Sequence, residues 1–373
     1  MSNSYLGLVF PNTHDESLSE LTAIRSMGSV PFGGRYRLID FALSNLVNAG
    51  IEKVGIITTS NYQSLMDHVG SGRAWDLDRK INGVHFIPPF IYGEDNGNAG
   101  RISSFAGAMS FLKRSKEDYV ILCDADVVAN IDLEPMIKQH IETGADFTVA
   151  YKKSTDSGVF RNIMLFSGIT PNGRITEIKM CNDEVKNPNY SLDIIVVKRE
   201  LLIDVISDAL SLGKTSLSRD VFQAGVDKYN IYGYEVSEYA KVITGFESYV
   251  QITNDVLKNS EIRQQLFNSN RPIFTKVRDD MPAKYGLQSN VKSSMVANGC
   301  IIDGKVKNSV LFRGVKIGKG AEVENCIIMQ DCVIGDNVKI KNITMDKNVT
   351  LTDNTTLNGA DDYPMYIRKG ATV

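Results

Sequence analysis

The chain has 373 residues, enough for two domains that each bury a core of their own. With 41 basic and 44 acidic residues its net charge is −3, so no overall field favours nucleic acid or an anionic membrane as partner. The five cysteines form no C-x-x-C pair, which argues against a zinc site. Without a signal-peptide pattern or an apolar run of membrane-spanning length, a cytoplasmic protein with reduced thiols is expected.

Short apolar runs alternate with segments of helical period between residues 5 and 222. The runs YLGLVF, KVGIITT and DYVILCDAD predict strands, and YRLIDFALSNLVNAG and RISSFAGAMSFLKRS predict helices between them. This alternation indicates an α/β fold with a mostly parallel sheet covered by helices. Ligands of such sheets bind beyond the carboxyl ends of the strands, so a site is expected just after these runs.

The last part of the chain has a different period. An aliphatic residue recurs roughly every six positions, often before Gly or Asp, as at Ile302, Ile317 and Ile334. Such a repeat predicts stacked coils, here a parallel β-helix; a plain antiparallel sheet of short strands is the alternative. We expect an α/β domain at 1–255, a linker or docking strap at 256–288 and the β-helix at 289–373.

Several long strings carry a resemblance to a known family. They are VPFGGRYRLIDFALSNLVNAGI (30–51), GRAWDLDR (72–79), PIFTKVRDDMPAKYG (272–286) and GCIIDGKVKNSVLFRGVKIGKGAEVENCIIM (299–329). Together they closely resemble bacterial ADP-glucose pyrophosphorylase, the glucose-1-phosphate adenylyltransferase of glycogen synthesis, almost end to end. The resemblance implies a mixed, Rossmann-like nucleotidyltransferase sheet, a C-terminal left-handed β-helix and a tetramer. It also implies a reaction of ATP with glucose 1-phosphate in which the protein neutralises phosphates and holds Mg²⁺.

The turn after the first strand departs from the family pattern. The family has a glycine-rich turn with an arginine there, which presents N–H groups and positive charge to phosphates. In this chain the glycine positions hold Asn12, Thr13 and Asp15, and the arginine position holds Ser17. Asp15 and Glu16 would repel a triphosphate. A glycine-free loop that binds nucleotide through its side chains is the alternative.

Two lysine positions of the family are also changed. Met27 stands where the family has a lysine that reaches the phosphates. Cys181 stands where a lysine grips glucose 1-phosphate, although Lys179 or Lys186 could take over that contact. No base adjoins Cys181 in sequence, so we expect a small semi-buried residue there rather than a catalytic thiolate.

The metal positions of the family are incomplete. Its members hold Mg²⁺ with two aspartates, and these positions are Asp126 and Val242 here. Valine cannot ligate a hard cation, so no metal site and no cofactor are expected in this chain, and Mg²⁺ is expected only in a catalytic partner. Asp126 is then either a vestige of the metal site or a cap of the following turn. No catalytic residue is expected.

Other family motifs are retained. They could line a residual sugar-nucleotide pocket, and structural support explains them equally well. These residues are Gly33, Gly34, Arg37, Trp75 and Asp76. In the strap, Arg278 and Lys284 could hold a phosphorylated effector, as basic residues near the domain junction do in this family, or form a solvated charged linker.

The altered charges lead to a functional expectation. The chain is similar to the non-catalytic regulatory subunit that some Gram-positive bacteria pair with a catalytic ADP-glucose pyrophosphorylase. A regulatory subunit with little or no activity is therefore expected, which activates its catalytic partner within a homo- or hetero-tetramer. One alternative is an active nucleotidyltransferase that makes ADP-glucose from ATP and glucose 1-phosphate. Another is a free-standing metabolite sensor.

Overall fold

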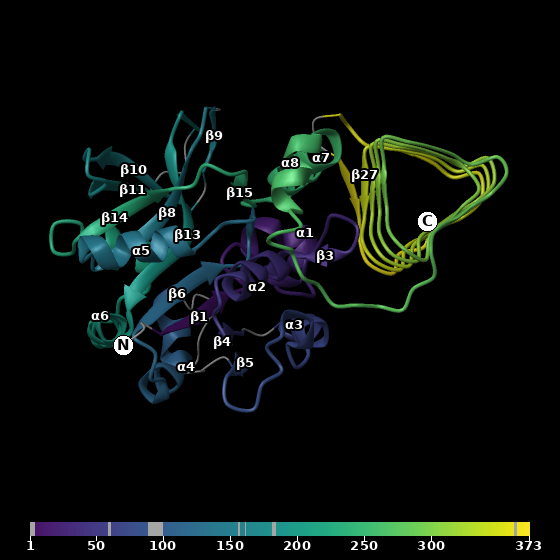
Figure 1. Ribbon diagram of the computed structural model, residues 1–373. Helices are drawn as coiled ribbons and strands as arrows, with labels where there is room; N and C mark the ends of the chain where they lie inside the picture. Colours follow the sequence, from purple (N-terminus) through teal and green to yellow (C-terminus); the bar gives the residue numbers. More distant parts are fainter. Residues whose placement is uncertain are drawn as a thin grey trace.

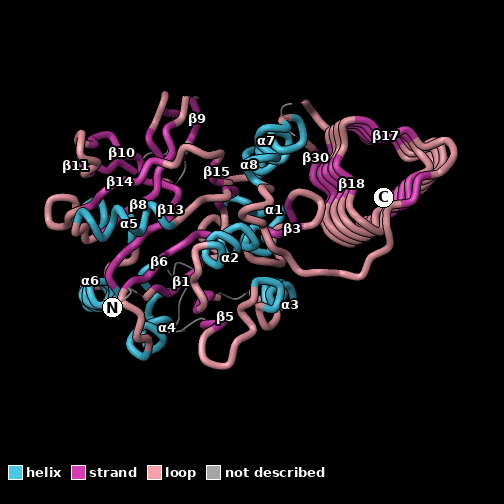
Figure 2. The backbone as a smooth tube through the Cα atoms, in the orientation of Figure 1, coloured by secondary structure: helices cyan, strands magenta, loops and turns pink. Residues whose placement is uncertain are grey.

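The computed structural model describes residues 4–58, 61–88, 100–155, 157–160, 162–180, 184–361 and 364–373. In Figure 1 an α/β unit lies beside a triangular solenoid that contains the C-terminus. Figure 2 shows that the described helices belong to the first unit, while the solenoid consists of short strands and turns. No helix in these ranges is both long and apolar enough to cross a bilayer.

A nine-stranded sheet forms the centre of the first unit in the described ranges. Its parallel half has the order β6-β1-β4-β5, and β13 adds to β6 in the antiparallel sense and starts a mixed half. The strands predicted from YLGLVF, KVGIITT and DYVILCDAD are confirmed. The strands are β1 Tyr5–Phe10, β4 Lys53–Ile57, β5 Gly83–Ile87, β6 Tyr119–Asp124, β8 Phe147–Lys153, β10 Met164–Ile169, β11 Ile175–Met180, β13 Asn189–Lys198 and β14 Ile231–Glu235.

Helices cover both faces of this sheet. On one face lie α4 (Arg101–Arg114) and α6 (Arg199–Ser211), and on the other α2 (Leu38–Asn48) and α5 (Glu134–Thr143). The spacing of three or four residues between the buried Ile102, Phe105, Ala108 and Leu112 places them on one side of α4, which explains why that side packs on the sheet. The other α-helices are α1 Ser19–Thr22, α3 Gln63–Val69, α7 Phe246–Lys258 and α8 Ser260–Leu266.

Short strands and turns complete the first unit. The β2–β3 and β7–β15 pairs are antiparallel, as is β9–β12. Their bounds are β2 Pro31–Phe32, β3 Tyr36–Arg37, β7 Val127–Ala129, β9 Ser157–Val159, β12 Glu184–Lys186 and β15 Ala240–Val242. Short 3₁₀ segments are η1 Glu16–Leu18, η2 Met27–Ser29 and η3 Arg73–Trp75, and a π-helical segment is η4 Leu217–Gln223.

The solenoid is a parallel β-helix with three five-stranded sheets in the described ranges, and all its strand pairs there are parallel, so the antiparallel alternative is wrong. One sheet has β16 Lys284–Tyr285, β19 Ile301–Ile302, β22 Lys316–Ile317, β25 Val333–Ile334 and β28 Thr350–Leu351. The second has β17 Asn290–Lys292, β20 Lys305–Lys307, β23 Glu322–Glu324, β26 Lys339–Lys341 and β29 Thr356–Asn358. The third has β18 Met295–Val296, β21 Val310–Leu311, β24 Ile327–Ile328, β27 Ile343–Met345 and β30 Met365–Ile367.

The repeat of the sequence explains the coils. Val306 pairs with Val323 and Val323 with Ile340, and all three side chains are buried inside the solenoid. Asparagines such as Asn325 and Asn342 turn the corners with positive φ angles of 52° and 55°, which Asn tolerates better than most residues. Stacking therefore buries an aliphatic column that no single coil could bury.

The two units share a core. Phe312 and Met329 of the β-helix pack in one buried cluster with Leu18 and Phe41 of the first unit. The stretch 256–288 between the units is not extended throughout, because it begins within α7 and includes α8. Residues 272–283 have neither helix nor strand, and the first solenoid strand follows at residue 284.

Candidate functional site

The loop after β1 is held by its own side chains. The backbone N–H of Met27 donates to Asp15 Oδ1 at 2.6 Å, and Asn12 Nδ2 donates to Asp15 Oδ2 at 2.5 Å. Burial raises the pKa of Asp15 to about 6, although these two hydrogen bonds oppose the rise. The carboxylate of Asp15 thus accepts two hydrogen bonds from the chain itself, and the exposed Glu16 follows it.

Ser17, at the family's arginine position, is half-buried in η1. Its N–H donates to the carbonyl of His14 at 3.1 Å, and Thr22 Oγ1 donates to the carbonyl of Asp15 at 2.5 Å. These bonds close the loop into a short helical turn. Ser17 therefore contributes no cationic side chain at the position where the family has arginine.

His14 is the residue of this loop that sequence reasoning missed. Its imidazole is buried, and Nδ1 hydrogen-bonds Oδ2 of Asp126, which follows β6. Burial alone would lower the pKa of His14, but the charges of Asp126, Asp124 and Asp193 outweigh it and raise the pKa to about 9. His14 is therefore an imidazolium at neutral pH. The carboxylate of Asp126 is bound by this ring instead of capping the following turn.

Arg101, at the start of α4, neutralises the other acids. Its Nη2 lies 2.6 Å from Asp124 Oδ1, and its Nη1 lies 3.1 Å from Asp124 Oδ2 and 3.7 Å from Asp193 Oδ2. The guanidinium also stacks over the ring of Phe10, 4.4 Å from its centre. Burial raises the pKa of Asp124 well above its usual range, and Arg101 opposes that rise. We call these five residues, His14, Arg101, Asp124, Asp126 and Asp193, the His14–Arg101 cluster.

The pairing of β1 with β6 explains why this cluster forms. Phe10 and Asp124 are in register at the carboxyl ends of these parallel strands, so the loops that follow both strands meet at one edge. A sequence signal existed, because Asp124 and Asp126 end a buried strand and His14 follows the neighbouring one. Buried acids at that edge require nearby positive charge.

The two positions that the resemblance assigns to a metal ion, Asp126 and Val242, lie close together. Val242 of β15 pairs with Val127 of β7, and the N–H of Ile243 donates to the carbonyl of Asp126 at 2.9 Å. Val242 nevertheless offers no ligand atom, and Asp126 is bound by His14. Across the described ranges, no group of three or more His, Cys, Asp or Glu could hold a metal ion. These residues do not fit Mg²⁺, because Val242 has no oxygen and Asp126 is already in contact with the imidazole of His14.

Met27, at the first lysine position, is fully buried in the core shared with the β-helix. The neighbouring Gly28 packs closely, since a Cβ there would lie 2.8 Å from Cβ of Pro11. The Met27 side chain therefore supports the junction of the two units. Cys181, at the second lysine position, lies outside the described residues, and the nearby Lys179 pairs with Glu177 at 3.1 Å.

The retained motif residues form turns and hydrogen bonds within the fold. Gly33 and Gly34 form the β2–β3 turn with φ angles of 56° and 84°, and Gly34 faces the β-helix. Arg37 precedes α2, where its N–H donates to Asp40 at 3.0 Å and its guanidinium donates to Ser64 Oγ at 2.9 Å.

Trp75 is buried beside His68, with 5.8 Å between the ring centres, and Asp76 is exposed and pairs with Arg79 at 2.6 Å. A groove of about 310 Å³ includes Trp75 and Asp76 in its wall. The structure therefore brings two of the five retained residues to one groove.

Basic side chains gather at the junction of the units. Burial lowers the pKa of Arg37 to about 10, and the neighbouring Arg25 and Arg278 lower it further. Burial likewise lowers the pKa of Lys347 to about 7, with Arg37 and Arg25 adding to the effect. Arg278 is exposed at this cluster, and Lys284 is exposed on β16 of the first coil.

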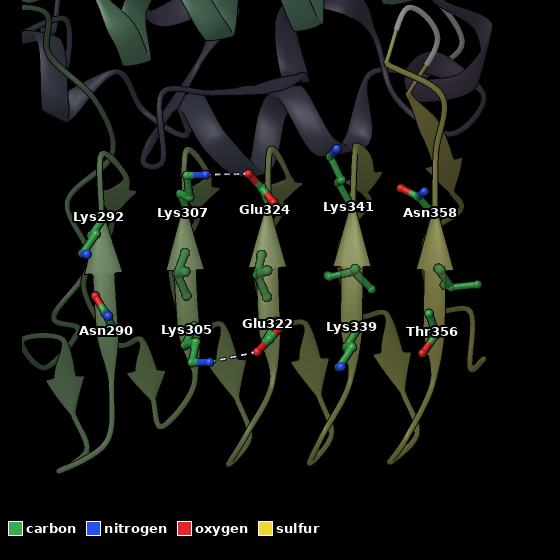
Figure 3. Close-up of a pocket in the computed structure, with 14 residues that line it drawn as sticks. Asn290, Lys292, Lys305, Lys307, Glu322, Glu324, Lys339, Lys341, Thr356 and Asn358 are labelled. Carbon is green, nitrogen blue, oxygen red and sulfur yellow. Dashed lines mark hydrogen bonds and ion pairs between the residues drawn. The ribbon is translucent and has the colours of Figure 1, made fainter.

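A groove of about 520 Å³ runs across the second sheet of the β-helix (Figure 3). Charged side chains stand in two rows along it. Lys305 pairs with Glu322 at 2.9 Å and Lys307 pairs with Glu324 at 2.8 Å, each with the next coil. Exposed pairs of this kind contribute little to stability, and the groove has the character of a solvated face.

Comparison with known proteins agrees with the two units of the fold. Residues 16–160 match the nucleotidyl transferase family model, and residues 280–363 match the GlmU-like C-terminal hexapeptide model. The chain is 40% identical to glycogen biosynthesis protein GlgD of Geobacillus stearothermophilus over 99% of this chain and 97% of that protein. It is 36% identical to GlgD of Bacillus subtilis (87% and 83% covered) and 30% identical to glucose-1-phosphate adenylyltransferase of Clostridium perfringens (87% and 84% covered). On this evidence the chain belongs to the ADP-glucose pyrophosphorylase family.

Proposed function

We propose that this protein is a regulatory subunit of glucose-1-phosphate adenylyltransferase in cytoplasmic glycogen synthesis. It has little or no activity alone, and it forms hetero-oligomers with a catalytic subunit and raises that subunit's activity. The observation that carries the proposal is the Asp15 carboxylate on the N–H of Met27, at the turn where the family receives phosphate.

The charge of this loop opposes the family's reaction. Two like charges 4 Å apart repel by about 4 kcal/mol at an effective dielectric constant of about 20. A phosphate brought to the Asp15 loop would meet that repulsion, and the loop offers it no arginine at Ser17 and no lysine at Met27. Phosphoryl transfer depends on neutralised phosphates and a held metal ion, so the rate of the isolated chain should be very low.

The fold supports a role through association. The sheet, its helices and the β-helix are all formed in this chain, and a relative named glycogen biosynthesis protein matches nearly the whole of it. Relatives named glucose-1-phosphate adenylyltransferase supply the class of partner. Activation requires only that the complex favour the partner's active conformation. The assembly in this proposal is a homo- or hetero-tetramer.

The basic junction extends the proposal to an effector. Arg37 and Lys347 are held in a crowded cationic environment, with Arg278 exposed at its edge. A phosphorylated metabolite bound there would relieve the repulsion among these groups. Arg278 and Lys284, which opens the first coil six residues further along the chain, are the proposed contacts of this metabolite.

Two assays test the proposed function. The purified chain is incubated with Mg²⁺, ATP and glucose 1-phosphate, first alone and then with the catalytic adenylyltransferase of the same cell. Negligible turnover alone and an increased turnover of the mixture are expected. Robust turnover by the chain alone would instead establish an active nucleotidyltransferase. If the two chains neither co-elute nor affect each other's activity, the proposal fails, and the free-standing sensor is the alternative to test next.

A further inference from the structure

Three buried carboxylates meet where β1, β6 and β13 lie side by side. Asp124 is 1% exposed, Asp126 is 2% exposed and Asp193 is 7% exposed. A buried carboxylate strongly destabilises a protein unless a positive charge and hydrogen bonds compensate it. Within the described residues, the ion pairs to these carboxylates come from His14 and Arg101. The chain therefore supplies the compensating charge from its own side chains.

The positions of these side chains matter as much as their charge. Asp126 is the aspartate that remains from the family's metal pair, and the strand with Val242 lies directly beside it. His14 reaches Asp126 from the loop after β1, across 112 positions of sequence. A cationic donor thus contacts the carboxylate that the family resemblance assigns to a metal ion.

We propose that His14 and Arg101 are a built-in substitute for the divalent cation that the family resemblance assigns to this sheet edge. They neutralise the carboxylates there, so the chain folds without a metal ion. The inference deepens the proposed function and rests on it in one respect, since a chain that bound Mg²⁺ productively would need neither side chain in this place.

The contacts of His14 and Asp15 also fix the position of the loop after β1. His14 anchors it to Asp126, and the next residue, Asp15, anchors it to the N–H of Met27. Removal of the His14 ring would leave Asp126 without its ionic partner, and Asp126 Oδ1 already finds no hydrogen-bond partner among the described residues. Both carboxylate oxygens of Asp126 would then lack a partner, and a hard cation could bind them.

The test uses the full chain and Mn²⁺ as the probe, because carboxylates bind Mn²⁺ and electron paramagnetic resonance detects it. His14→Ala should lower the Tm by about 5–10 °C, as expected when a buried pair loses one partner. Millimolar Mn²⁺ should raise the Tm of His14→Ala and leave that of the unmodified protein unchanged. Adding Asp126→Asn to His14→Ala should restore most of the lost Tm, because it removes the unpaired charge.

His68→Ala is the matched control. His68 Nε2 also binds a buried carboxylate, Asp40 Oδ1 at 2.5 Å, but lies outside the cluster. This variant should lose stability and show no response to Mn²⁺, because a single carboxylate remains there. If His14→Ala does not fold, the double variant with Asp126→Asn still should.

Several results would overturn the inference. One is that Mn²⁺ binds the unmodified protein and raises its Tm. The second is that His14→Ala is as stable as the parent, and the third is that this variant does not respond to Mn²⁺. The fourth is that the double variant fails to fold. The proposed function is judged separately, by turnover and by activation of a partner. Metal binding without turnover would refute the substitute cation and leave the regulatory function standing.

Discussion

A buried ion pair joins the two units and gives a sharp prediction. Arg25 Nη2 donates to both carboxylate oxygens of Asp346 at 2.9 Å, and Tyr366 Oη donates to Asp346 Oδ2 at 3.0 Å. Arg25 is 2% exposed and Asp346 is 1% exposed, so water cannot replace a missing partner. Asp346→Ala should therefore lower the free energy of unfolding by about 3–5 kcal/mol, the cost of leaving a buried guanidinium uncompensated.

Urea unfolding, followed by circular dichroism, measures this loss. The double variant Arg25→Met, Asp346→Leu should recover most of the stability, because it removes both charges and fills a similar volume. Glu322→Ala is the control, since its pair with Lys305 is exposed and should contribute less than about 1 kcal/mol. A loss in Asp346→Ala no larger than that of the control, or a double variant less stable than the single one, would refute the reasoning.

Three further predictions concern the cleft and the junction. The pKa of His14 is raised to about 9 from 6.5, so its stabilising effect is complete below pH 6.5 and is lost as the pH rises through 9. The lowered pKa of Lys347 acts in the opposite sense over the same range, so the parent is compared with His14→Gln: the difference between their unfolding free energies should shrink by about 3 kcal/mol from pH 6.5 to 10, and a constant difference would contradict the ion pair. Met27→Lys should lower the urea midpoint without adding turnover, whereas Met27→Leu should be nearly neutral; a gain of activity in the lysine variant would contradict the buried placement. Phe312→Ala should cost about 3–5 kcal/mol by opening a cavity between the units, and an unchanged midpoint would show that they do not share a core.

The fold was predictable because its patterns are local. The run YVILCD is buried at every position in β6, as expected for a strand covered on both faces. The 17-residue spacing from Val306 to Val323 and on to Ile340 defines the coils directly. Within the segment 256–288, the helix α8 has seven residues, too few for a helical period to stand out in the sequence.

The site was predictable only in part. The positions Ser17, Met27 and Val242 stood out because they change charge within recognisable motifs. The contact between His14 and Asp126 could not be read from any motif, since it depends on two loops brought together by the register of β1 and β6. The sequence shows that polar residues follow both strands, but the specific pairing of His14 with Asp126 depends on the tertiary structure.

At the carboxyl ends of β1 and β6, the chain's own side chains compensate both a buried carboxylate and a backbone N–H group. In the family's reaction a phosphate meets backbone N–H groups and a cation meets carboxylates. Here Asp15 meets the N–H of Met27, and His14 meets Asp126. A sheet edge that no longer needs ligands for its charge balance can keep its shape in their absence, because its buried groups remain compensated. The proposed loss of catalysis is therefore compatible with an intact fold.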